Sequence, residues 1–204
     1  MSKIRTTIII SAALATTLTL AACSSNSDSG SMPGMDMGGS ASSSASGAAN
    51  SGPHNDADVA FAMGMVPHHK QAVEMADMIL KKDGISPDVI TLAKKIEAAQ
   101  GPEITTMTAW LKTWGTEPAA SMPGMDMGTG MMSEADMNDL DKATGLAASK
   151  LFVQQMTQHH NGAITMAQTE LSSGKNPDAV ALAKNIVKAQ TAEITQMQTI
   201  LKTL

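Results

Sequence analysis

Hydrophobic residues recur at helical spacing in two long stretches of the chain. In the first, positions suited to burial step by four and three residues through Phe61, Met65, His68, Ala72, Met75 and Ile79. The second repeats the pattern at Phe152, Met156, His159, Ala163 and Met166. Steps of three and four place side chains on one face of an α-helix, so each stretch predicts a helix with one buried face.

A second amphipathic segment follows each of these helices. The matching faces lie at Val89, Ala93, Ile96, Gln100, Glu103 and Met107, and at Ala183, Ile186, Gln190, Glu193 and Met197. Ser86-Pro87 and Asn176-Pro177 place helix-starting signals ahead of the second segments, and no stretch is convincing as a strand. Two hairpins that must cover their apolar faces predict an all-α fold, an antiparallel four-helix bundle over residues 55–204.

The two hairpins are copies of one unit. Residues 61–76 align with 152–167, and residues 87–112 align with 177–202 with 14 of 26 positions identical. The octapeptide SMPGMDMG also occurs twice, ninety positions apart, as the leading edge of each copy. This predicts repeat units at 55–114 and 146–204, a Met-rich linker at 115–133 and a short helix at 134–143, which opens on a capping box at Ser133.

The N-terminal residues are typical of an export signal. Lys3 and Arg5 precede an apolar run that ends in Leu-Ala-Ala-Cys23, which resembles a bacterial lipobox. Residues 1–22 are therefore predicted to be a lipoprotein signal peptide, and Cys23, the sole cysteine, to carry the lipid. A non-lipidated signal peptide or an N-terminal membrane helix is the alternative, although the run is short for a span. The mature protein is expected outside the cytoplasmic membrane and anchored to it, with residues 23–54 as a flexible Ser/Gly/Met-rich tether.

Composition narrows the partners. Without residues 1–22 the chain has 12 lysines, no arginine and 19 acidic residues, a net charge of −7, which argues against nucleic acid as a partner. The chain has 18 methionines but 2 Phe, 2 Trp and no Tyr, more methionine than core filling requires. The oligomeric state is not predicted.

Four of the five histidines form two adjacent pairs, His68-His69 and His159-His160. Neighbouring residues on a helix diverge by about 100°, so we expect His68 and His159 to face inward, and His69 and His160 to lie nearer the edge in ligand or solvent roles. The inward rings are metal ligands, or core residues hydrogen-bonded across the bundle. In either case the expected polar partners, which would also stand behind a metal's ligands, are Gln100, Glu103, Gln190 and Glu193.

Further methionines lie in loop sequence that has no core to fill. The two octapeptides supply the candidate metal ligands Met32, Met35, Met37, Met122, Met125 and Met127. Thioether sulfur is soft and imidazole intermediate, and no thiolate is available, which favours Cu(I), with Ag(I) as a mimic and Cu(II) possible at histidine. Zinc is disfavoured because its sites prefer thiolate, several imidazoles or carboxylate.

The spacing Met-Val-Pro-His-His-x-x-Ala-x-x-Met-Ala, followed by Gln-x-x-Glu-Ile-x-x-Met, resembles the CopM-like family of extracytoplasmic bacterial proteins, a DUF305-type domain. The resemblance covers about 55–204, twice over, and implies a ferritin-like four-helix bundle that binds copper in metal resistance. It carries the metal-binding role to Met65, His68, His69, Met75, Met156, His159, His160 and Met166. Ser149 stands where the motif has Asp58, so any role of Asp58 is not expected to be duplicated.

These observations favour a lipid-anchored protein that sequesters copper or hands it to another copper protein. A structural or partner-binding lipoprotein with core histidines is the alternative. A ferritin-like di-metal oxidase is disfavoured. Such sites use Glu-x-x-His motifs, but Glu103 and Glu193, the only acidic residues repeated on the buried helix faces, have no histidine three residues later.

Overall fold

The computed structural model describes residues 52–116 and 130–204. These residues form five helices, α1 (Asp56–Leu80), α2 (Pro87–Thr113), α3 (Glu134–Lys142), α4 (Gly145–Ser173) and α5 (Pro177–Thr203), and contain no strand. The signal peptide, Cys23, nearly all of the tether and the six loop methionines of the octapeptides lie outside the described residues. No helix in the described ranges is long and apolar enough to cross a membrane.

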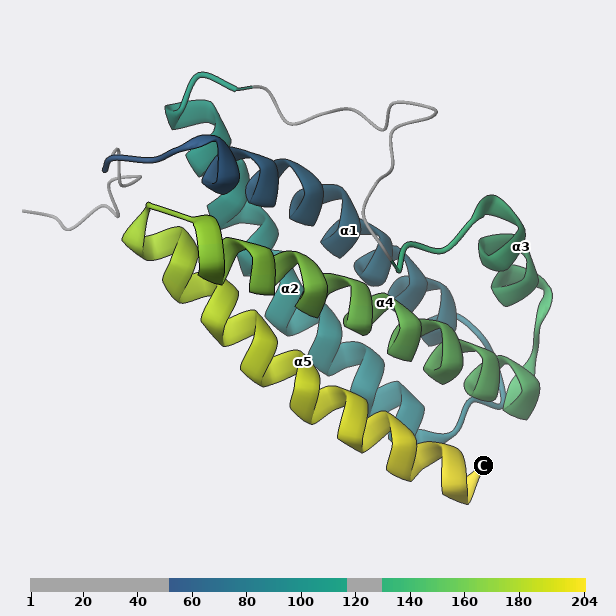
Figure 1. Ribbon diagram of the computed structural model, residues 1–204. Coiled ribbons are helices and arrows are strands. Elements are labelled where there is room, and N and C mark those ends of the chain that lie inside the picture. Colours follow the sequence, from purple (N-terminus) through teal and green to yellow (C-terminus); the bar gives the residue numbers. More distant parts are fainter. Residues whose placement is uncertain (1–51, 117–129) are drawn as a thin grey trace, which may run out of the picture. The chain divides into compact units, whose positions relative to one another are not determined.

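The four long helices form the predicted bundle. Helices α1 and α2 make one hairpin and α4 and α5 the other, and α1 also packs along α4 (Figure 1). The short α3 contacts α1 and α4, and its Leu140 is part of the hydrophobic core. The all-α four-helix bundle expected from the hydrophobic pattern is confirmed.

The helix starts follow from local side-chain chemistry. Asn55 caps α1 by accepting from the backbone N–H of Ala57 and Asp58, and the Asp58 carboxylate accepts in return from the N–H of Asn55 at 2.7 Å. Ser133 and Asp136 make the same reciprocal capping box on α3. These side chains satisfy backbone donors that a helix start leaves unpaired, so they define where each helix begins.

The hydrophobic core is divided into two clusters. One is built around Ile79, Leu92, Phe152 and Met156, and the other around Phe61, Met65, Trp110 and Ile186. Each long helix contributes to both clusters, and on each helix the break between them falls at polar residues of the central turns. A polar layer therefore crosses the middle of the bundle.

The linker returns to the bundle at the level of this layer. A Cβ on Gly130, whose φ is +98°, would lie 2.8 Å from the Cα of Gly162 on α4, so only glycine fits this approach. Two residues later the backbone N–H and C=O of Met132 pair with the side-chain amide of Gln71 on α1, at 2.8 and 2.9 Å. These contacts position the start of α3 against α1 and α4.

Asp58 also ties the two hairpins together. Its Oδ1 accepts from the backbone N–H of Lys175 and Asn176, at 3.0 and 2.8 Å, in the turn before α5. At the equivalent place in the repeat, the hydroxyl of Ser149 accepts from the N–H of Ser86 at 3.1 Å, in the turn before α2. The expectation that the role of Asp58 is not duplicated is therefore wrong for this contact, because a hydroxyl accepts from a backbone N–H as a carboxylate does.

The two contacts are expected to differ in strength. Asp58→Ala should lower the free energy of unfolding by about 2–3 kcal/mol, because three buried or half-buried backbone donors lose a charged acceptor. Ser149→Ala removes one neutral hydrogen bond and should cost about 1 kcal/mol. Urea denaturation of both variants at pH 7 measures the difference, and equal losses would show that the charge of Asp58 is immaterial to the joint.

Candidate metal centre

The polar layer is assembled from all four long helices. Its members are His68 and His69 on α1, Gln100 and Glu103 on α2, His159 and His160 on α4, and Gln190 and Glu193 on α5. All four histidine side chains are fully buried. The repeat explains the arrangement, since each hairpin supplies two adjacent histidines and one Gln-x-x-Glu segment.

His69 and His160 are buried and do not lie at the edge of the bundle, contrary to expectation. His69 Nε2 lies 2.7 Å from Glu103 Oε2, and His160 Nε2 lies 2.8 Å from Glu193 Oε2. The sequence-based expectation gave these glutamates to His68 and His159 instead. The difference arises because each helix packs against two neighbours: one face turns to the opposite hairpin, and a face about 100° away turns to the helix of its own hairpin.

The inner histidines meet each other at the centre. The ring centroids of His68 and His159 are 3.7 Å apart, with the planes inclined by 43°. Burial, together with the nearby rings of His68, His160 and His69, holds the pKa of His159 well below its usual value. The imidazole of His159 is therefore neutral at pH 7 and retains a nitrogen lone pair, the form in which histidine binds metals.

Several polar atoms of the layer are buried without a hydrogen-bond partner among the described residues. They are Nδ1 of His69, Nδ1 of His160, Oε1 of Gln100 and Oε1 of Gln190. The sequence analysis expects Gln100 and Gln190 to be partners of the inward histidines, but the side-chain oxygens of these glutamines accept no hydrogen bond from a histidine. A buried polar atom without a partner costs about 1–3 kcal/mol, so this layer reduces the stability of the metal-free bundle.

Sulfur lies on both sides of the layer. Met65, Met75 and Met156 are completely buried, whereas Met166, expected on the same buried face, is half-buried and packs beside Gly64. Met107 and Met197 are also completely buried, one turn beyond Glu103 and Glu193. The sequence analysis places these two methionines on the buried faces but not among the candidate ligands, and the Glu-x-x-x-Met spacing in both copies was the available signal.

Histidines and carboxylates alone do not make a preformed site. Within residues 52–116 and 130–204, no three His, Cys, Asp or Glu side chains are placed to hold one metal ion together. An ion in the layer would therefore need thioether sulfur beside one or two imidazoles, or a shift of the rings. Mixed nitrogen and sulfur ligation of this kind selects soft monovalent ions.

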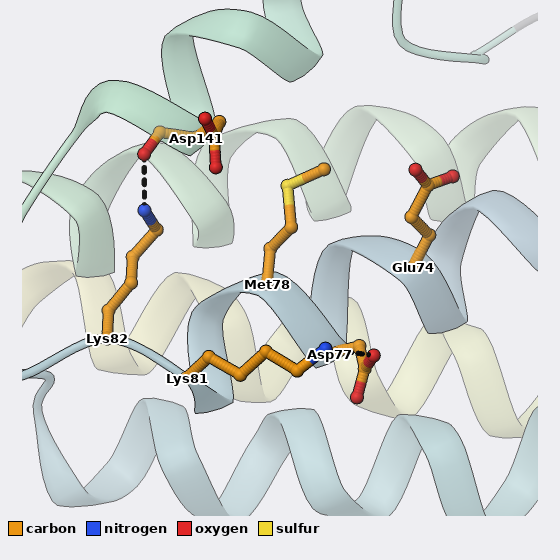
Figure 2. Close-up of a pocket in the computed structure, with 6 residues that line it drawn as sticks. All are labelled: Glu74, Asp77, Met78, Lys81, Lys82 and Asp141. Carbon is orange, nitrogen blue, oxygen red and sulfur yellow. Dashed lines mark hydrogen bonds and ion pairs between the residues drawn. The ribbon is translucent and has the colours of Figure 1, made fainter.

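A surface pocket lies away from the layer, between the C-terminal part of α1 and the end of α3. It encloses about 570 Å³ and is lined by Glu74, Asp77, Met78, Lys81, Lys82 and Asp141 (Figure 2). Lys81 pairs with Asp77 at 2.8 Å, and Lys82 donates to the backbone oxygen of Asp141. Its lysines are already engaged with its own acceptors and it contains no histidine, so it is not the candidate centre.

A pair of neighbouring carboxyl groups, Glu170 and Asp58, is not predicted by the sequence analysis. Glu170, near the end of α4, is 1% exposed and lies against Asp58. Burial, followed by a hydrogen bond to Asp58 and the charge of Asp58, raises the pKa of Glu170 to about 8. Burial also acts to raise the pKa of Asp58, but hydrogen bonds from the Asn176 and Asn55 backbone and from Glu170 outweigh it and lower that pKa. At pH 7 the pair therefore shares one proton, held mainly by Glu170.

Comparison with known proteins agrees with this architecture. The model of a domain of unknown function, DUF305, matches residues 58–201. The crystal structure of a DUF305 fragment from Deinococcus radiodurans is 31% identical, with a TM-score of 0.68 over 74% of this chain and 99% of that one. A DUF305 protein from Streptomyces coelicolor, inferred to be secreted, is 32% identical, with a TM-score of 0.66 over 72% of this chain and 92% of that one.

The chain is also similar to a protein solved with metals. CopM in its Cu(I)-bound form is 29% identical, with a TM-score of 0.62 over 72% of this chain and 96% of that one. CopM has also been solved with Cu(II) and with silver. No curated protein matches the chain significantly. The CopM structures indicate that metal binding occurs among proteins of this fold and sequence type.

Proposed function

Because the chain belongs to the DUF305 family, whose model covers residues 58–201, we propose that it is a copper-binding protein of the cell envelope that sequesters or transfers the ion. The supporting observation is the buried layer of four imidazoles with thioether sulfur on both sides. Burying polar groups without hydrogen-bond partners lowers the stability of a protein. We therefore interpret this layer as a binding site for an ion rather than as part of the structural core.

The chemistry of the donors favours Cu(I), with silver as a substitute. A neutral imidazole and a thioether are soft enough for a monovalent d¹⁰ ion and bring no charge into the interior. Glu103 and Glu193 hold the Nε2 atoms of His69 and His160, which leaves the Nδ1 atoms as the ligand atoms of those rings. Cu(II) remains the secondary cargo, at the histidines alone.

The proposed ligands in the bundle are those the resemblance implies, with two additions. They are Met65, His68, His69, Met75, Met156, His159, His160 and Met166, joined by the buried Met107 and Met197. The loop methionines of the two octapeptides would capture the ion first, because three sulfurs within six residues can wrap an ion of low coordination number.

The location proposed for this chemistry is outside the cytoplasmic membrane. The relative inferred to be secreted supports an extracytoplasmic site, and the lipobox-like sequence at Cys23 supports a lipid anchor. Methionine also suits an oxidising compartment, since it binds soft metals without forming disulfides. Another copper protein at the same membrane is the proposed recipient when the ion is transferred.

Competition titration of the metal-free protein tests the proposal. The mature chain should take Cu(I) from a chromogenic chelator, and replacing His69 and His160 together by glutamine should weaken binding by about 10- to 100-fold, the range for groups in or beside a ligand set. His54→Gln is the matched control, because His54 is not part of the layer: its ring stacks on that of Trp114, with the ring centroids 4.8 Å apart. If the double histidine variant binds Cu(I) as tightly as the wild-type chain, the layer is not the site.

A further inference from the structure

The two His–Glu pairs of the layer are related by the repeat but are not alike. Glu103 and Glu193 hold their histidines at nearly the same distance, 2.7 and 2.8 Å. The Glu103 side chain is 22% exposed, however, whereas that of Glu193 is 5% exposed. One end of the layer is therefore open to solvent and the other is nearly closed.

Lys95 on α2 lies at the nearly closed end. Its Nζ lies 3.4 Å from Oε1 of Glu193, so both oxygens of that carboxylate are engaged, one by Lys95 and one by His160. Burial acts to raise the pKa of Glu193, but His160 and Lys95 outweigh it and lower that pKa. Among the described lysines, no other is paired with a carboxylate of the layer.

The repeat supplies an internal comparison. Position 185 on α5 corresponds to position 95 on α2, and it is Asn185, an exposed neutral residue. The lysine that pairs with Glu193 in one copy of the unit is therefore replaced by a neutral residue at the aligned position of the other copy. The two copies have diverged in charge at this position.

The difference decides which end a cation approaches. An ammonium within 4 Å of a buried carboxylate cancels the attraction of that carboxylate for a second cation. A partly exposed carboxylate without such a neighbour attracts the cation. We propose that the metal ion enters and leaves the polar layer past Glu103, and that Lys95 closes the equivalent route past Glu193. This inference rests on the proposed copper-binding function and adds the path of exchange to it.

Exchange of the two residues tests the path. Cu(I) uptake from a chromogenic chelator, and release to an excess of it, are followed by stopped flow in the mature chain. Lys95→Asn should raise both rates by about three- to tenfold, because it opens a second route, while the affinity changes less. Asn185→Lys should lower both rates by a similar factor, and the double exchange should return them toward the wild-type values.

The outcomes separate the inference from the function on which it rests. Normal Cu(I) affinity with rates unchanged in both single variants overturns the path and leaves the copper-binding function standing. Absence of Cu(I) binding by the wild-type chain overturns both. A measurement without metal checks the premise: at constant pH, the carboxyl carbon NMR signal of Glu193 should shift in Lys95→Asn and stay in place in Asn185→Lys, because only the first change removes the ammonium 3.4 Å from that carboxylate. An unchanged signal in Lys95→Asn would remove the basis for the closed end.

Discussion

His159→Leu is expected to make the metal-free protein more stable while weakening its copper binding. His159 is completely buried, its pKa is lowered chiefly by that burial, and it has no ion pair among the described residues. Replacing a buried polar group by an apolar one of similar size removes its desolvation cost, so the free energy of unfolding should rise by about 1–3 kcal/mol. Loss of a ligand should meanwhile weaken Cu(I) binding.

The adjacent histidine provides the contrast. His160→Leu leaves one oxygen of the buried Glu193 carboxylate without its 2.8 Å partner, while Lys95 still pairs with the other oxygen, so the free energy of unfolding should fall by about 1–3 kcal/mol. Urea denaturation of the two metal-free variants, with and without one equivalent of Cu(I), measures both effects. If His159→Leu destabilises the protein as strongly as His160→Leu, His159 is a structural core residue, as the alternative interpretation of the sequence holds.

Glu170→Gln is expected to remove a large pH dependence of stability. The pKa of Glu170 is about 8 in the folded protein and near 4.5 when the chain is unfolded. Between these values the folded state holds a proton that the unfolded state has lost, so the free energy of unfolding falls as the pH rises from about 5 to 8 and levels off above. The pKa difference corresponds to a loss on the order of 5 kcal/mol.

Glutamine keeps the shape and can donate a hydrogen bond to Asp58, but it does not titrate. The variant should therefore match the wild type near pH 5 and exceed it above pH 8, as measured by urea denaturation across that range. Asp58 does not confuse the comparison, because its lowered pKa contributes stability that is lost only at acidic pH, below its unperturbed value of 3.8. Parallel curves for wild type and variant would show that Glu170 is ionised throughout.

The helices and their repetition could be predicted from the sequence because they depend on local information. Spacing by three and four residues, Pro87 and Pro177 at helix starts, and the capping box at Ser133 act within one or two turns of the chain. The candidate chemistry was visible for the same reason, since adjacent histidines with methionines at helical spacing form a local pattern. An antiparallel four-helix bundle then followed from the need to cover two apolar faces.

The partners of those histidines were decided only by the tertiary structure. His69 meets Glu103 across 34 residues and His160 meets Glu193 across 33, and the choice depends on how far each helix is rotated about its axis. The same holds for Lys95 beside Glu193 and for Glu170 beside Asp58, pairs that no local pattern signals. The sequence by itself determined which side chains occupy the seam; helix rotation and packing determined which of them touch, because burial and charge contacts are properties of neighbouring helices rather than of one chain segment.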